Sequence, residues 1–117
     1  MTYYYYLASD QQMGLGNGSL DFIKTDVQIP GFDVPLQLEM MNGVERDWEL
    51  RELLQYIHNH TAPYHTCTVQ IANLLNTHRT ELKVREKRKV LLHEITSPKQ
   101  LLLEEGQLLT IKKVPVY

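Results

Sequence analysis

Residues 58–67, HNHTAPYHTC, bring three of the five histidines and the only cysteine into ten positions. Imidazole and thiolate groups are the usual protein ligands of zinc. The same two groups form the nucleophile and base of cysteine-dependent enzymes. The segment therefore raises two chemical hypotheses, a metal site and a catalytic site. The candidate metal ligands are His58, His60, His65 and Cys67.

The metal hypothesis requires about four ligands that converge on one point. On a continuous helix, the side chains of His58 and His60 would point about 200° apart. Histidines in the last turn of a helix also interact favourably with its dipole, so they need no ligand to explain them. The spacing of the four residues matches none of the usual paired zinc patterns. We therefore expect no metal and no other cofactor.

The catalytic hypothesis makes Cys67 the nucleophile, with His65 or His78 as its base. A reactive cysteine must be an exposed thiolate with an orienting partner. A helix over residues 66–78 would instead place Cys67 beside Ile71 on an apolar face, where a free cysteine behaves as a small buried group. The cluster is thus interpreted as a junction between two helices. A Cys/His-dependent enzyme or metal site is the third functional hypothesis.

Two central helices are expected to position this junction. The first begins after Asn42, which can act as its N-cap, and carries its leucines on one arc of about 100°. The leucine arc consists of Leu50, Leu53, Leu54 and Ile57. The second helix is predicted over residues 66–78, and Pro63 interrupts the chain between the two.

Strands are expected on both sides of the helices. The aromatic run at residues 2–8 and the alternating residues 34–41 predict strands before them, and residues 81–84 and 88–96 predict strands after them. Residues 100–116 predict a hairpin around Gly106, and the alternative is a short helix over 98–105 that Ser97 caps.

The expected fold class is α+β in a single domain of 117 residues. A mostly antiparallel sheet is built from N- and C-terminal strands, and the two central helices pack on one face of that sheet. The order of the strands does not follow from the sequence.

Trp48 lies outside the leucine arc, on the side of the first helix that also holds Val44 and Arg51. One interpretation is that a neighbouring loop or strand covers the indole, because tryptophan is usually well buried. The other is a protein-binding surface formed by these three residues, since tryptophan is enriched among interface hot spots.

Residues 79–89 hold six of the twelve basic residues and two of the fourteen acidic ones, on a chain with a net charge of −2. The segment 71–89 partly resembles a helix-turn-helix DNA-binding motif, with Ile71, Ala72 and Leu75 at inward positions of its first helix. The resemblance implies phosphate contacts from a basic strip. This strip consists of Arg79, Lys83, Arg85, Lys87, Arg88 and Lys89. Alternation of apolar and charged residues favours instead a strand with a charged outer face.

The composition predicts a globular protein without a membrane-spanning segment. An apolar content of 43% allows a proper core, and the sequence has neither a signal peptide nor an apolar run of the ~20 residues that a membrane span needs. A single cysteine suits a reducing compartment, so a cytoplasmic location is expected. The sequence favours a small, soluble, non-catalytic module that binds another protein or itself in a regulatory role. The second hypothesis is nucleic-acid binding through residues 71–89.

Overall fold

The computed structural model of the chain describes residues 2–15, 20, 22–25, 28–40, 44–76 and 84–115. Its elements, in chain order, are β1 (Thr2–Ser9), β2 (Phe22–Lys24), β3 (Leu36–Met40), α1 (Asp47–Thr61), β4 (Cys67–Asn76), β5 (Glu86–Leu91), the 3-10 turns η1 (Leu92–Glu94) and η2 (Pro98–Leu101), and β6 (Gln107–Lys113).

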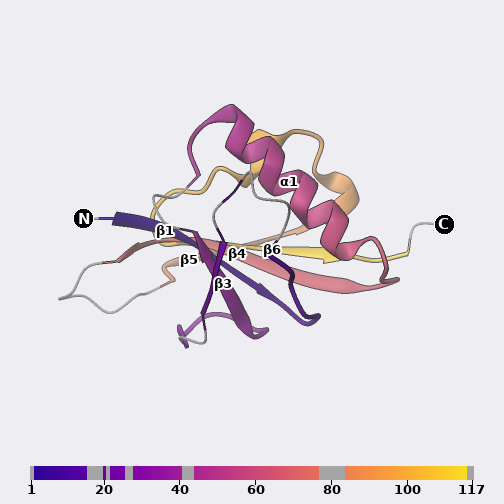
Figure 1. Ribbon diagram of the computed structural model, residues 1–117, viewed down its shortest axis with the longest axis horizontal. Coiled ribbons are helices and arrows are strands. Elements are labelled where there is room, and N and C mark those ends of the chain that lie inside the picture. Colours follow the sequence, from indigo (N-terminus) through magenta and orange to yellow (C-terminus); the bar gives the residue numbers. More distant parts are fainter. Residues whose placement is uncertain are drawn as a thin grey trace.

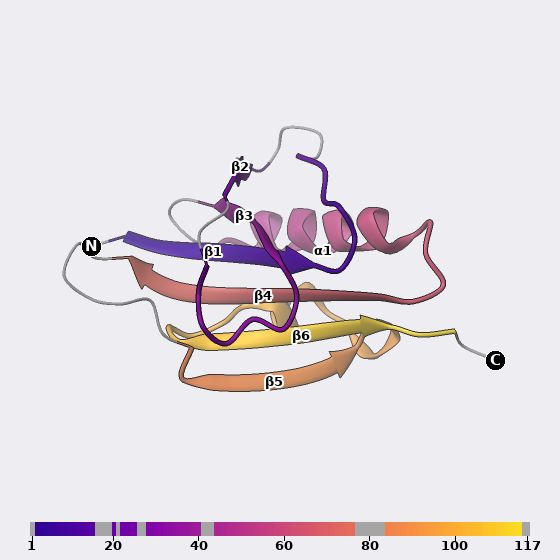
Figure 2. The same cartoon turned by 90° about the horizontal axis from the view of Figure 1, so that it is seen from below.

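The six strands form one sheet in the order β2-β3-β1-β4-β6-β5 (Figure 2). Strands β5 and β6 run parallel, and the other neighbours run antiparallel. The expected α+β class with a mostly antiparallel sheet is confirmed. Strands from the two ends of the chain, β1 and β6, flank β4 at the centre. Among the described residues, no helix has the length and apolar character that a membrane crossing requires.

The prediction of two central helices is wrong, because residues 67–76 form strand β4 and α1 is the one α-helix in the described part of the chain. Cys67, Val69 and Ile71 point toward α1, whereas Ala72 and Leu74 point to the opposite face of the sheet. A strand that is buried on both faces lacks the polar alternation of a surface strand. Its apolar residues then fall at helical spacing by coincidence.

Helix α1 forms as expected but begins later than predicted, after Arg46 as N-cap. Residue 42 lies outside the described part of the chain. The side chain of Glu49 accepts hydrogen bonds from the backbone N–H groups of Glu45 and Arg46, at 3.3 and 3.0 Å. These bonds satisfy donors that a helix start leaves free. Leu50 and Leu53, from the predicted leucine arc, are buried against the sheet.

The main core lies between α1 and one face of the sheet, and the chain between β5 and β6 crosses the same face (Figure 1). This crossing segment contributes Leu92, Ile95, Leu101 and Leu103 to the core. A smaller cluster on the other face packs Ile29 and Phe32 over Tyr6. The sheet is therefore covered by a helix on one side and by a loop on the other.

The predicted hairpin over residues 100–116 is wrong, because η2 occupies Pro98–Leu101 and β6 begins only at Gln107. The alternative, a helix capped by Ser97, is closer to the structure. The Ser97 side chain accepts from the N–H of Lys99, and the Gln100 side chain accepts from the N–H of Ser97 at 2.9 Å. This reciprocal capping stabilises a short turn that strand propensity alone would not predict. Likewise, the predicted strand 88–96 ends at Leu91 and gives way to η1.

Candidate functional site

The end of β1, the last turn of α1 and the start of β4 meet at a polar cluster of four side chains, which we call the Ser9 cluster. It consists of Ser9, Asp10, His60 and Cys67. The Oγ of Ser9 lies 2.9 Å from Nε2 of His60 and 3.7 Å from Sγ of Cys67. The Cys67 thiol also donates to Oδ1 of Asp10 at 3.4 Å, and its Sγ lies 3.9 Å from Nε2 of His60.

Burial governs the protonation of the Ser9 cluster. Desolvation lowers the pKa of His60, and the charge of Asp10 opposes this shift. Desolvation also raises the pKa of Cys67, an effect that the hydrogen bond from Ser9 partly offsets. Near neutral pH the imidazole is therefore uncharged and the sulfur is a thiol. The cluster is a hydrogen-bonded network of neutral groups beside one carboxylate.

The chemistry of a Cys–His pair requires a nucleophile that a substrate can reach. Ser9 is 0% exposed and Cys67 is 2% exposed, so both nucleophilic atoms are covered. Cys67 is buried as predicted, although on a strand instead of a helix. His65 is exposed, and His78 lies outside the described residues. Among the described histidines, the fold brings His60 to Cys67.

The four candidate metal ligands do not converge. His60 and Cys67 approach each other, but His58 and His65 are exposed and point elsewhere. Within the described ranges, no three His, Cys, Asp or Glu side chains are placed to hold a metal ion. The end of α1 is instead stabilised by Lys113, whose ammonium group donates to the carbonyl oxygen of Thr61 at 2.9 Å.

Aromatic rings surround His60 on its partly exposed side. Its ring stacks on Tyr56 with an interplanar angle of 4°, and Tyr64 meets it edge-on. Phe22 of β2 packs against Tyr56, whose hydroxyl donates to the carbonyl oxygen of Gly14. Burial raises the pKa of Tyr56 to about 12, so this hydroxyl stays protonated. The rings hold the imidazole in the orientation that meets Ser9.

Ser9 and Asp10 were not among the residues singled out in the sequence. Ser9 is separated from His60 by 51 positions, so no local spacing links them. One signal was present: period-two alternation along β1 places Ser9 on the same buried face as Tyr5 and Leu7. A hydroxyl at the end of a buried face requires a polar partner.

The predicted protein-binding residues separate in the structure. Trp48 is 42% exposed, and Arg51, one turn further along α1, is also exposed. Val44 is 1% exposed and belongs to the main core, so it offers no contact surface. The sequence placed Val44 and Trp48 on the same side of a helix. Val44 lies before the start of α1 at Asp47, so its side chain does not have that helical orientation.

The described residues of the basic strip are exposed, and three of them, Lys87, Arg88 and Lys89, lie on strand β5. Lys87 forms an ion pair with Asp33 at 3.4 Å, and Arg85, just before the strand, pairs with Glu105 at 3.4 Å. Arg88 and Lys89 are exposed and form no ion pair with any described residue. The pKa of Lys89 is lowered, mainly by its hydrogen bond to the Lys112 side chain and secondly by the positive charge of Lys112.

The helix-turn-helix interpretation is wrong for the residues of its first helix that the structure describes. Ile71, Ala72 and Leu75 lie in β4 and not in a helix. Arg79 and Lys83 lie outside the described residues.

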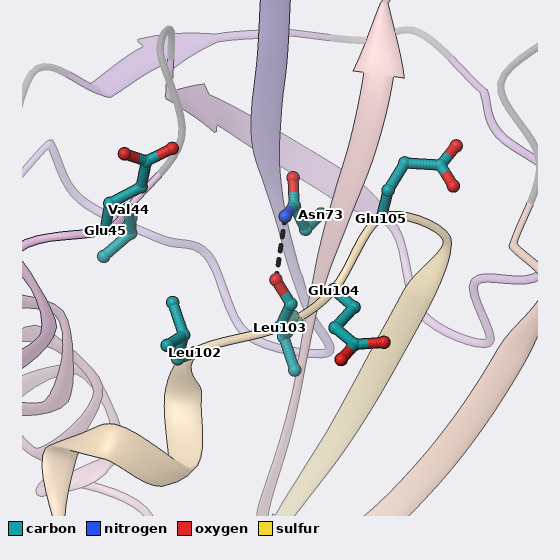
Figure 3. A pocket seen from close by; sticks show the side chains of 7 residues that line it. All are labelled: Val44, Glu45, Asn73, Leu102, Leu103, Glu104 and Glu105. Atoms are coloured by element: carbon teal, nitrogen blue, oxygen red, sulfur yellow. Dashed lines mark hydrogen bonds between the residues drawn. The ribbon is translucent and has the colours of Figure 1, made fainter.

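A surface depression of about 290 Å³ lies where the start of α1 faces the end of the crossing segment (Figure 3). It is lined by Val44, Glu45, Asn73, Leu102, Leu103, Glu104 and Glu105. Nδ2 of Asn73 donates to the carbonyl oxygen of Leu103 at 2.8 Å, whereas its Oδ1 is buried without a hydrogen-bond partner among the described residues. Three glutamates make this depression acidic.

No family model, curated protein or solved structure matches this chain.

Proposed function

We propose that the protein is a small non-catalytic module that binds another protein through the outward side of α1, at Trp48 and Arg51. The observation that carries this proposal is the 42% exposure of the Trp48 indole. Leu50 and Leu53 anchor the opposite side of the helix in the core, so the indole is presented by a fixed support. Tryptophan and arginine are the residues most often found at interface hot spots.

The burial of the Ser9 cluster supports a non-catalytic role. Its hydroxyl and thiol are covered, and its imidazole is engaged by Ser9 and flanked by tyrosines. These contacts join three elements and leave no reacting atom open to a substrate. We assign the cluster a structural role, and we place the module in the cytoplasm because its single cysteine suits a reducing compartment.

The test uses Trp48 as its own reporter, because it is the only tryptophan in the chain. Wild-type protein and the Trp48→Ala and Arg51→Glu variants are immobilised and exposed to an extract of cells that express the protein. Any retained protein is then purified and titrated against each form by calorimetry, because Trp48→Ala carries no tryptophan to report binding. We expect the wild type to bind with a blue shift of tryptophan emission. Trp48→Ala should lose about 2 kcal/mol or more of binding free energy, the usual loss at an interface hot spot.

Leu102→Ala supplies the matched control, because Leu102 is also an exposed apolar side chain, at 50%, but lies in the crossing segment. This variant should bind as the wild type does. Trp48→Ala should also leave the free energy of unfolding within about 1 kcal/mol of the wild type. A partner that binds Trp48→Ala with full affinity contradicts the proposal, as does a loss of several kcal/mol in stability, which would mean that the indole is part of the core.

Nucleic-acid binding is the second candidate, and the observation that favours it is the absence of ion pairs at Arg88 and Lys89 among the described residues. Binding to phosphates would weaken steeply as salt rises. An electrophoretic shift of DNA or RNA in dilute buffer that disappears at higher salt would support it. Residues 71–76, which a helix-turn-helix unit needs in its first helix, form part of strand β4 instead.

A further inference from the structure

Strand β5 ends the sheet on one side, and no described residue pairs with its outer edge (Figure 2). The strand is six residues long, and its first four residues, 86–89, are exposed. An edge strand presents a row of unpaired N–H and C=O groups, which can accept a further strand. The opposite edge, β2, has only three residues and offers a much shorter template.

Basic side chains flank this edge on both faces of the sheet. Lys87 and Lys89 pair in register with Leu108 and Thr110 and share the face of the smaller cluster. Arg88 pairs with Leu109 and lies on the face of the main core. Asp33 lies 3.4 Å from Lys87, whereas Arg88 and Lys89 have no carboxylate partner in the described part of the chain.

This arrangement of charge opposes pairing with a second copy of the same strand. Two β5 strands side by side would bring lysine and arginine ammonium and guanidinium groups together, and like charges on neighbouring strands are destabilising. Carboxylates on an added strand would meet those same groups with favourable charge. The charge of β5 therefore disfavours pairing with a second β5 strand and favours pairing with an acidic strand.

We propose that β5 is a docking edge for an acidic, extended segment of another protein, which joins the sheet by strand addition. Backbone hydrogen bonds to the outward groups of β5 hold the segment, and its carboxylates lie opposite Arg88 and Lys89. The positive side chains alternate between the two faces of the sheet, as the side chains of an added strand do. This alternation favours a peptide over a nucleic acid, whose phosphates follow one continuous line.

The test uses a labelled peptide of about ten residues, the length of a long strand, in which pairs of adjacent glutamates alternate with threonine–valine pairs, so that carboxylates lie on both faces. Binding is measured by fluorescence anisotropy at low salt, and hydrogen exchange is followed at the amides of β5. We expect saturable binding with slowed exchange in β5. Lys89→Glu should weaken the affinity about fivefold or more. Lys99→Glu, the same change of charge at an exposed position of η2, should leave it unchanged.

A second peptide, in which proline replaces the threonines and valines, carries the same charge but lacks half of the strand's backbone donors. It should not bind. Equal binding of this peptide would overturn strand addition, because charge alone would then suffice. An oligonucleotide of equal charge that binds where the first peptide does not would also overturn the proposal, and so would the absence of any peptide binding. Trp48→Ala should leave the peptide's affinity unchanged, which separates this docking edge from the contact proposed at α1.

Discussion

The hydroxyl of Ser9 and the imidazole of His60 meet at 2.9 Å, across 51 positions of sequence. Ser9 ends β1 and His60 lies in the last turn of α1, so this hydrogen bond fixes the end of the helix above the sheet. Cys67, at the start of β4, completes the contact. The segment that raised the question of metal or nucleophilic chemistry thus contributes two of its members to a buried junction.

Replacing Ser9 with alanine should destabilise the fold. Ser9→Ala leaves Nε2 of His60 with only the 3.9 Å contact to Cys67 and removes the acceptor of the Gln11 N–H, which lies 3.1 Å from Oγ. An unpaired buried polar group costs about 1–3 kcal/mol. Urea unfolding measures the loss. Thr66→Ala, at an exposed position nearby, should change the free energy of unfolding by less than about 0.5 kcal/mol.

The stability of the protein should depend on pH through His60. Burial lowers the pKa of His60 below the ordinary value of 6.5, so the folded state binds this proton more weakly than the unfolded chain does. Unfolding takes up a proton between the two pKa values. The contribution of His60 to the free energy of unfolding is therefore highest above pH 6.5. It decreases as the pH falls from 6.5 through the folded pKa.

The measurement is the urea midpoint of wild type and variants from pH 8 to pH 5. His60→Gln should lose the part of the pH dependence that comes from this imidazole, whereas His58→Gln, at an exposed position on the same helix, should keep it. Identical pH profiles for wild type and His60→Gln would show that His60 is not desolvated in the fold.

Cys67 should react with thiol reagents only after the protein opens. Its side chain is 2% exposed, and burial raises the pKa of its thiol, so the native state offers little thiolate. We expect iodoacetamide to label the native protein at least about 100-fold more slowly than the protein in urea. Fast labelling of the native protein would mean that the Ser9 cluster is accessible, and the catalytic hypothesis would then return.

The hydroxyl of Tyr5 should contribute more to the free energy of unfolding than that of Tyr4. Its hydroxyl donates to the carbonyl oxygen of Leu101 at 3.0 Å and accepts from the N–H of Leu103 at 2.8 Å. Burial raises its pKa to about 12, so it remains a donor. Tyr5→Phe strands two backbone groups and should cost about 2 kcal/mol or more in urea unfolding. Tyr4→Phe, at a half-buried position on the other face, is the control and should cost less than 1 kcal/mol, roughly the effect of a surface change.

Elements with a one-sided pattern could be predicted from the sequence. The alternating residues of β3 and the leucine arc of α1 each mark one buried face, and both elements were found. Strand β4 could not be identified in this way. It is buried on both faces, and its neighbours β1 and β6 are known only from the tertiary structure. The 3-10 turn after Ser97 depends on capping bonds that override the strand propensity of three leucines.

The polar cluster illustrates the same limit. The sequence did not predict that His60, alone of the three histidines in residues 58–67, would approach Cys67. The helix carries His60 toward Ser9, and the strand places Cys67 beside it. This meeting depends on the order of strands in the sheet, which no local spacing of residues contains.

The central place of β4 also has a consequence for synthesis on the ribosome. Its partner β1 is made first, but its other partner, β6, ends at Lys113. A nascent chain that has reached β5 can pair β1 with β4, yet β4 keeps one side bare of hydrogen-bonding partners until translation has passed β6. Such an intermediate would present an apolar strand to other chains, so a chaperone should bind most strongly after β5 and before β6 has been made.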